Sequence, residues 1–316
     1  MKVEEKTKSK TKNFKLTSKQ NNQLSLWSFC AIPMLLVFVF CYIPMGGIVI
    51  AFKEYRYDQG IFGSRWVGLN NFKFFFESNE FFRITWNTLY MNFLFILVGI
   101  TCAVIVAVLL FEIKSKMKVK VFHTLLITPY FMSWVLASYM VYAFLNPAYG
   151  MVNQFLAKLG MKGIEFYSES EIWPIILLVV FVWKNVGMDS VLYYATLMGL
   201  DESLFEAAYL DGANEFQKAR YITIPSLIPV ITLLTIMKIG GIFRADFGLF
   251  YQIPRNVGTL YKTTDVIDTY IFRNLRTLGN VGMSSAVGLL QSVVGFVLIL
   301  VTNKVSKKID PDGGLF

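Results

Sequence analysis

Six long apolar stretches constrain the fold of this chain more than any other feature of its sequence. A helix needs about 20 apolar residues to cross about 30 Å of hydrocarbon, where its backbone must satisfy its own hydrogen bonds. The stretches cover residues 27–52, 86–110, 121–145, 172–197, 227–250 and 281–302. The sequence therefore predicts an all-α integral membrane protein with six transmembrane helices. The first stretch is interrupted by Pro33 and Pro44, and the fifth by Gly240-Gly241.

The overall composition supports this class and excludes an ordinary soluble domain. Hydrophobic residues make up 55% of the 316 residues and charged residues only 16%, whereas about a quarter of a soluble domain is charged. The Lys-rich N-terminus before an apolar run resembles a signal peptide. However, residues 27–52 are too long for the hydrophobic region of such a peptide and lack an A-x-A cleavage site. We therefore expect this stretch to be retained as the first span.

The basic residues predict how the chain is oriented. With six spans, both termini lie on one side, and that side carries sixteen Lys and Arg residues against eleven on the other. Because basic residues are enriched in short cytoplasmic segments, both termini are expected in the cytoplasm. The expected regions are a disordered basic tail at 1–26, a transmembrane domain at 27–302 and a C-terminal tail at 303–316. The net charge of +9 is explained by anionic lipid headgroups, so no nucleic-acid partner is expected.

The polar loop at residues 199–225, between the fourth and fifth spans, is expected to hold two short helices. The capping-box pattern at Ser203–Glu206 predicts a helix start near residue 203, and Gly212 can adopt the positive φ that ends this helix. The pattern at Asn214–Gln217 predicts a second helix start, and we expect that helix to reach about residue 222 before Pro225 stops it.

One face of this loop carries little side-chain bulk. It consists of Ala207, Ala208, Gly212 and Ala213. Such a face allows another surface to approach closely. The alternative is a loop that only connects two spans.

Three segments of the loop match a known motif in composition and spacing. They are Glu206-Ala207-Ala208, Asp211-Gly212-Ala213 and Ile222-Thr223-Ile224-Pro225. Together they resemble the EAA motif of the permease subunits of binding-protein-dependent ABC importers, with Ile224 in place of the family's leucine. Further segments resemble the oligosaccharide and polysaccharide branch of the carbohydrate importers: Tyr42–Gly47, Ala51–Lys53, Gly68–Phe72, Asn146-Pro147, Trp183–Asn185 and Asp265–Tyr270.

This resemblance implies a type I importer permease fold with cytoplasmic coupling helices in a bacterial cell membrane. The loop would dock on a cytoplasmic ATPase through Glu206, Ala207, Ala208, Asp211, Gly212, Ala213 and Phe216. The implied partners are a second homologous permease, two ATPase subunits and an extracytoplasmic solute-binding protein. The substrate would be an oligosaccharide. No cofactor is implied for this chain, since ATP and Mg would bind the partner ATPase.

The sequence gives little support for other classes of activity. It has no G-x-x-x-x-G-K-[ST] segment to hold phosphates and a single histidine, so it is expected to be a non-catalytic subunit. An ion-coupled secondary transporter remains an alternative. It would need a relay of buried carboxylates, whereas Asp189 is the one acid clearly inside a predicted span. A structural or signalling membrane subunit would leave the polar face of the fourth span unexplained.

Polar residues inside the spans are the candidates for a substrate pathway, because such residues are unfavourable in lipid unless they face protein or water. Asn185, Asp189 and Tyr193 share one face of the fourth span at intervals of four residues. Arg244, Asp246 and Gln291 are the candidates on the fifth and sixth spans. No metal site is expected.

These residues also have a purely structural interpretation. Asp189 can pair with Lys184 or Lys238, and Arg244 with Asp246 can anchor a helix end. If the residues do line a pathway, the excess of cations favours an acidic sugar. The small residues Ser284, Gly288 and Ser292 of the sixth span are expected to pack inside the bundle, with a dimer contact as the alternative.

Overall fold

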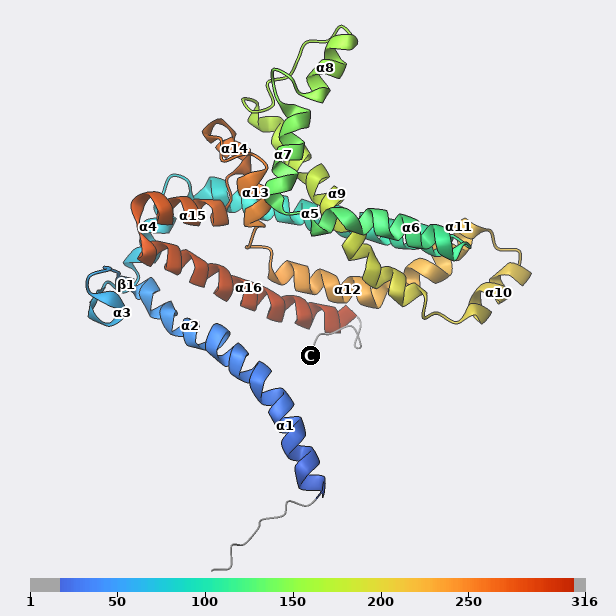
Figure 1. The fold of residues 1–316 in the computed structure, drawn as a ribbon, viewed down its shortest axis with the longest axis horizontal. Helices are drawn as coiled ribbons and strands as arrows, with labels where there is room; N and C mark the ends of the chain where they lie inside the picture. Colours follow the sequence, from blue (N-terminus) through green and yellow to red (C-terminus); the bar gives the residue numbers. More distant parts are fainter. Residues whose placement is uncertain (1–17, 310–316) are drawn as a thin grey trace, which may run out of the picture.

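The computed structural model describes residues 18–309 and is mainly helical (Figure 1). Within this range five helical segments are long and apolar enough to cross a membrane, and a bent pair makes a sixth span when counted as one. The helices of the spans are α1 (Ser18–Val37) with α2 (Ile43–Met45), α5 (Phe81–Phe111), α6 (Lys116–Ile127) with α7 (Trp134–Leu145), α9 (Trp173–Leu197), α12 (Ile224–Gly240) and α16 (Val281–Ile309).

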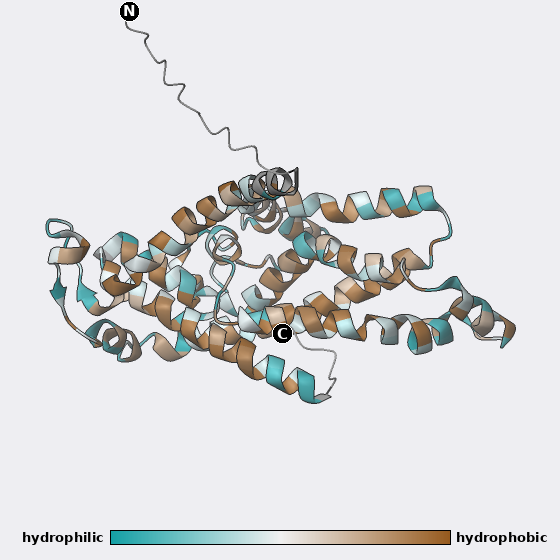
Figure 2. Ribbon diagram, turned by 90° about the horizontal axis from the view of Figure 1, so that it is seen from below, coloured by the Kyte–Doolittle hydropathy of each residue, from teal (hydrophilic) through white to brown (hydrophobic). Residues whose placement is uncertain are grey.

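Shorter elements connect the spans. The helices are α3 (Gly60–Gly63), α4 (Asn70–Phe76), α8 (Met151–Lys158), α10 (Glu202–Leu210), α11 (Glu215–Lys218), α13 (Phe247–Gln252), α14 (Tyr261–Thr264) and α15 (Ile267–Leu278). Strands β1 (Lys53–Glu54) and β2 (Arg65–Trp66) pair antiparallel, with Lys53 opposite Trp66. Hydrophobic residues follow the long helices, and hydrophilic residues gather in the connections at the two ends of the bundle (Figure 2).

The first span projects away from the other helices (Figure 1). It continues from α1 through a π-helical segment at Phe38–Tyr42 and α2 into a 3₁₀ segment at Gly46–Phe52. Only 6% of its most apolar window is buried within the subunit. Because α1 begins at Ser18, part of the predicted tail at 1–26 is helical, while residues 1–17 lie outside the described part of the chain.

The third span is not the single helix over 121–145 that hydropathy predicts. It breaks between α6 and α7, whose axes meet at 100°. Pro129 lies in the short 3₁₀ segment Thr128–Phe131 and has no N–H to continue the ladder of α6. Ser133 then starts a new helix, because its Oγ accepts a hydrogen bond from Leu136 N at 3.2 Å.

The carbonyl groups freed by this break are satisfied by Lys184 of α9. Its Nζ donates to the carbonyl oxygens of Pro129 (3.3 Å), Tyr130 (2.7 Å) and Met132 (2.6 Å). The same ammonium group lies 5.0 Å from the centre of the Trp134 ring. Irregular backbone is tolerated at membrane depth where protein groups satisfy it, and here one lysine supplies the donors.

Close contact between α9 and α6 depends on Gly187. A Cβ at this position would lie 1.9 Å from the carbonyl oxygen of Leu126. Small residues at helix contacts drive packing in membranes, where lipid is as apolar as the helix surfaces.

The fifth span begins earlier and ends earlier than the predicted 227–250. A single helical segment runs from Glu215 to Gly240, with a π-helical segment at Ala219–Thr223 between α11 and α12. The expectation that Pro225 stops the second loop helix is wrong, because Pro225 lies in the first turn of α12 and the π-helical segment accommodates it. The last helix also extends beyond the predicted 302, to Ile309.

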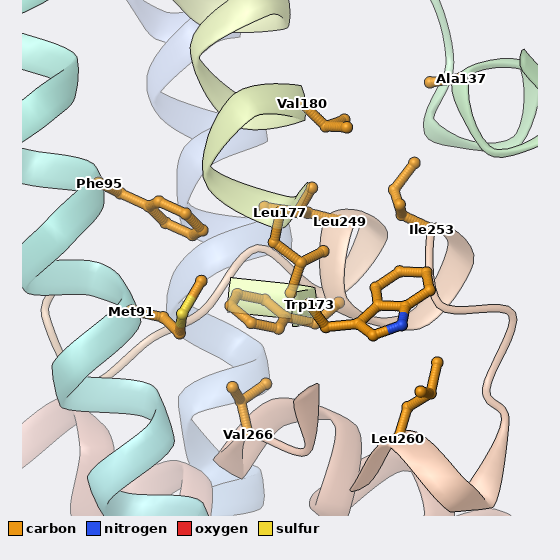
Figure 3. Packing of buried hydrophobic residues seen from close by; sticks show 11 residues of the cluster. Met91, Phe95, Ala137, Trp173, Leu177, Val180, Leu249, Ile253, Leu260 and Val266 are labelled. Carbon is orange, nitrogen blue, oxygen red and sulfur yellow. The ribbon is translucent and has the colours of Figure 1, made fainter. Parts of the chain in front are cut away.

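The main buried cluster joins α5, α7, α9 and α13 (Figure 3). Trp173 of α9 is fully buried at its centre, and its Nε1 donates to the carbonyl oxygen of Phe166 at 2.6 Å. Phe95 of α5 stacks on Phe181 of α9 with ring centres 4.3 Å apart. This cluster fixes α13 against the spans and so positions the turn that precedes α13.

Candidate functional site

The loop between α9 and α12 contains the two helices predicted from the sequence. Asp201, rather than Ser203, caps α10, since its Oδ1 accepts from Ser203 N at 3.0 Å. The predicted helix start was therefore close, but its capping box was wrong. The hydrogen bonds from Ser203 lower the pKa of Asp201.

The end of α10 and the start of α11 follow the prediction. Gly212 has φ +77°, and Ala213 N donates to the carbonyl oxygen of Ala208 at 2.9 Å. Asn214 and Gln217 form a complete capping box, with Asn214 N to Gln217 Oε1 at 2.8 Å and Gln217 N to Asn214 Oδ1 at 2.9 Å.

Large apolar side chains are exposed on this loop. Tyr209, Leu210 and Phe216 are 73%, 84% and 74% exposed, and Ala207 is exposed beside them. A cavity of about 690 Å³ lies between α10 and the end of α5, lined by Phe111, Lys114, Glu202, Phe205, Glu206, Tyr209 and Leu210. A cluster of exposed apolar residues at the polar end of a bundle is typical of a protein interaction site.

At the opposite end of α12, the turn at residues 241–246 is fixed by three neighbouring helices. Asn92 of α5 donates to the carbonyl oxygens of Ile242 (2.8 Å) and Arg244 (3.1 Å). Asp268 of α15 accepts from Ala245 N at 2.8 Å, and Gln291 of α16 donates to the carbonyl oxygen of Phe243 at 2.7 Å. Gln291 thus holds this turn, and burial raises the pKa of Asp268.

A cavity of about 210 Å³ lies between this turn, α5 and α9. We call it the central cavity. Its lining residues are Asn92, Phe95, Ile96, Phe181, Lys238, Gly241, Ile242, Arg244 and Asp246. It therefore brings together the predicted Arg244 and Asp246 with aromatic rings and a second cation.

The two predicted charges of the central cavity have different partners. Arg244 Nη2 donates to Ser292 Oγ at 2.8 Å, and within residues 18–309 no carboxylate lies within 4.0 Å of it. Asp246 accepts from Trp134 Nε1 at 3.0 Å and caps α13 through Leu249 N at 3.2 Å. The guanidinium of Arg244 is therefore available to an anionic group.

The predicted polar face of α9 has more than one role. Asp189 forms an ion pair with Lys238 of α12 at 2.8 Å, as the structural interpretation expects. Asn185 donates to the carbonyl oxygen of Phe181 in its own helix at 3.0 Å. Tyr193 is buried in a cluster with residues of α5 and α12, away from the central cavity.

The stripe on α16 packs only in part. Ser284 is buried, whereas Ser292 is exposed and a Cβ at Gly288 would have no neighbour within 4 Å.

Sequence reasoning missed Asn92 and misjudged Lys184. Asn92 is an amide inside the second apolar stretch, and the rule that polar residues within a span mark function would have found it. The role of Lys184 had no such signal, because its carbonyl partners lie more than 50 residues away in a segment that reads as a plain span.

The comparisons with known proteins agree with this architecture. The family described as binding-protein-dependent transport system inner membrane component matches residues 80–311. The chain belongs to this family, and it is a permease subunit of a binding-protein-dependent ABC importer.

The chain is 34% identical to Protein LplB of Bacillus subtilis (strain 168), covering 89% of this chain and 88% of that protein. It is 32% identical to the polygalacturonan/rhamnogalacturonan transport system permease protein YteP of the same organism, covering 87% and 85%. It also resembles a chain in the crystal structure of a bacterial alginate ABC transporter in complex with an alginate pentasaccharide-bound periplasmic protein. The TM-score is 0.82 and the identity 30%, covering 92% of this chain and 96% of that chain.

Proposed function

We propose that this subunit carries oligosaccharides of acidic polysaccharides into the cytoplasm, driven by ATP hydrolysis on partner subunits. One observation carries the proposal: the helical segment Glu215–Gly240 joins the exposed loop at one end to the central cavity at the other. Its 26 residues extend about 39 Å at 1.5 Å per residue. A movement of α11 is therefore transmitted directly to the turn that carries Arg244.

The loop between α9 and α12, which we call the coupling loop, meets the ATPase in this proposal. Glu206, Ala207, Ala208, Asp211, Gly212, Ala213 and Phe216 supply the contact surface, and the exposed Tyr209 and Leu210 extend it. ATP and Mg bind the ATPase subunits. Both termini then lie in the cytoplasm, and a solute-binding protein delivers substrate at the opposite end.

A second permease completes the pathway. The exposed first span supports this, because its apolar surface needs either lipid or another subunit. The alginate transporter whose fold this chain shares was solved with a periplasmic protein bound, which supports the same assembly here.

The central cavity supports an acidic saccharide as substrate. Two of the similar transporters act on uronate polymers, polygalacturonan and alginate. Arg244 offers a planar guanidinium for a carboxylate, and Asn92 and Asp246 lie beside it for hydroxyl groups. Asp189, Tyr193 and Gln291 then serve this pathway by holding the surrounding segments together, and Asn185 serves it from the same face of α9 as Asp189.

The test is uptake of tetragalacturonate into proteoliposomes that contain the complete transporter and its solute-binding protein. We expect uptake that needs ATP on the cytoplasmic side and that falls at least about tenfold in Arg244→Gln, since a charge-assisted hydrogen bond contributes about 1.5–3 kcal/mol. Uptake driven by a proton or sodium gradient without ATP would contradict the proposal and favour a secondary transporter.

A further inference from the structure

A second cavity, of about 220 Å³, lies between α7 and the end of α13. We call it the tyrosine cavity. The residues of its lining that carry functional groups are Ser138, Tyr139, Tyr251, Gln252, Arg255 and Asn256. It combines aromatic rings, amides and one guanidinium, which are the groups that bind the faces, hydroxyls and carboxylates of sugars. None of its residues belongs to the lining of the central cavity.

Arg255 provides the positive charge of the tyrosine cavity. Its guanidinium lies 4.2 Å from the centre of the Tyr142 ring and 5.7 Å from that of Tyr139. Across the described part of the chain, no carboxylate lies within 4.0 Å of it. Cation–π contact with these two rings orients the guanidinium and leaves N–H groups for a ligand.

The backbone at this position is strained. Arg255 has φ +57° and the next residue, Asn256, has φ +52°, a conformation that costs non-glycine residues about 1 kcal/mol or more each. Local hydrogen bonds hold it: Arg255 N donates to the carbonyl oxygen of Gln252 at 3.1 Å, and Tyr261 Oη donates to Asn256 Oδ1 at 2.9 Å. Strain of this kind is concentrated at functional sites, where it fixes a side chain in place.

The two cavities lie at opposite ends of α13. Asp246 lines the central cavity and caps the start of α13, while Gln252 ends α13 and lines the tyrosine cavity. This six-residue helix is about 9 Å long. Trp134 at the start of α7 contacts Asp246, and Tyr139 lies further along α7. The two cavities are therefore separated by about the length of α13, a distance that an oligosaccharide can span.

We propose that the tyrosine cavity is a second saccharide subsite, at which Arg255 binds the carboxylate of one uronate residue while another residue of the same oligosaccharide occupies the central cavity. The inference rests on the proposed function. Tyr139 and Tyr251 pack against the sugar ring, and Gln252 and Asn256 bond its hydroxyl groups. Arg244 and Arg255 then bind two carboxylates of one chain, so the permease prefers acidic oligosaccharides to single sugars.

The experiment measures binding of tetragalacturonate and of its fully methyl-esterified form to the complete transporter in nanodiscs. Arg255→Gln should weaken binding of tetragalacturonate about tenfold or more and leave binding of the neutral ester unchanged. Only the acid has free carboxylate groups that pair with the Arg255 guanidinium. Arg255→Lys should give an intermediate loss, since it keeps the charge without the planar fork. Arg276→Gln is the matched control, because it removes an exposed charge outside the cavity.

Uptake by the same variants separates this subsite from the function on which it rests. If the wild type imports tetragalacturonate with ATP but Arg255→Gln binds it as tightly as Arg276→Gln does, the subsite is wrong and the proposed function stands. If the wild type imports no saccharide, the proposed function fails and the subsite fails with it.

Discussion

The ammonium group of Lys184 lies between α9 and the broken third span, where it donates to three carbonyl oxygens. In the sequence it looks like one of several cations that could meet an anionic substrate. In the structure its donors are used by the backbone, so a ligand of the central and tyrosine cavities meets the guanidinium groups of Arg244 and Arg255 instead.

Replacing Lys184 by methionine should therefore destabilise the protein. The change leaves the carbonyl groups of Tyr130 and Met132 without this donor, whereas the Pro129 carbonyl keeps its bond from Met132 N. An unsatisfied buried polar group costs about 1–3 kcal/mol. We expect Lys184→Met to lower the unfolding temperature of the detergent-solubilised transporter by several degrees. Lys162→Met, in an exposed loop, is the control and should melt with the wild type. Equal melting of both variants would contradict this role.

Gly187 allows a second prediction at the scale of one residue. Gly187→Ala places a methyl group 1.9 Å from the Leu126 carbonyl oxygen, so α6 and α9 cannot keep their contact. We expect little monodisperse protein on size-exclusion chromatography. Gly288→Ala adds the same methyl group where no atom lies within 4 Å and should leave the yield unchanged. Similar yields of the two variants would show that α6 and α9 move apart easily.

Among the elements, α10, α11 and α12 form the link between the ATPase and the central cavity in the proposed function. The link is stiff because α11 passes into α12 through hydrogen-bonded π-helical turns rather than through a loop. Replacing Ala219 and Arg220 together by glycine should soften it, since each glycine costs about 1 kcal/mol in a helix. We expect less saccharide imported per ATP hydrolysed.

The matched control for this link is a glycine pair at Lys307 and Lys308, near the end of α16. It should leave the ratio of transport to hydrolysis unchanged. An unchanged ratio in the Ala219/Arg220 variant as well would mean that α11 does not transmit the movement of the ATPase.

The loop helices and the two prolines near them show which features of this chain can be predicted from local sequence rules. The Asn214–Gln217 capping box and the positive φ of Gly212 depend on neighbours within a few residues, and both were predicted correctly. The path of the helix through Pro225 and the break at Pro129 depend on tertiary context. Pro225 is accommodated by a π-helical segment. Pro129 ends its helix, and Lys184, far away in sequence, satisfies the carbonyl groups that the break leaves free.

The candidate site, like the helices, was predicted only in part from the sequence. Arg244 and Asp246 do line a cavity, but hydropathy put them inside a helix rather than in the turn after Gly240. Tyr193 and Gln291 have the polar groups of a pathway residue, yet packing buries the first and the turn at 241–246 engages the second. The spacing of residues along one helix shows which of them share a face, but it does not show which other segment that face contacts.

At the scale of the whole molecule, the exposed first span predicts that the subunit needs a partner subunit to remain stable. Its apolar window is only 6% buried in this subunit. Expressed alone, the subunit should aggregate or be degraded, and co-expression with its second permease should restore a monodisperse peak on size-exclusion chromatography. A stable, monodisperse subunit in isolation would argue that lipid alone covers this span.

In the proposed function, an ATPase moves this subunit through the coupling loop. The most direct measurement is a cysteine cross-link between Ala207→Cys and the ATPase, in membranes containing the complete transporter, with the three native cysteines replaced. Lys116→Cys, exposed at the start of α6, is the control. We predict a cross-link from position 207 whose yield changes when ATP binds, and none from position 116. A folded, assembled transporter without a cross-link from position 207 would contradict this role of the loop.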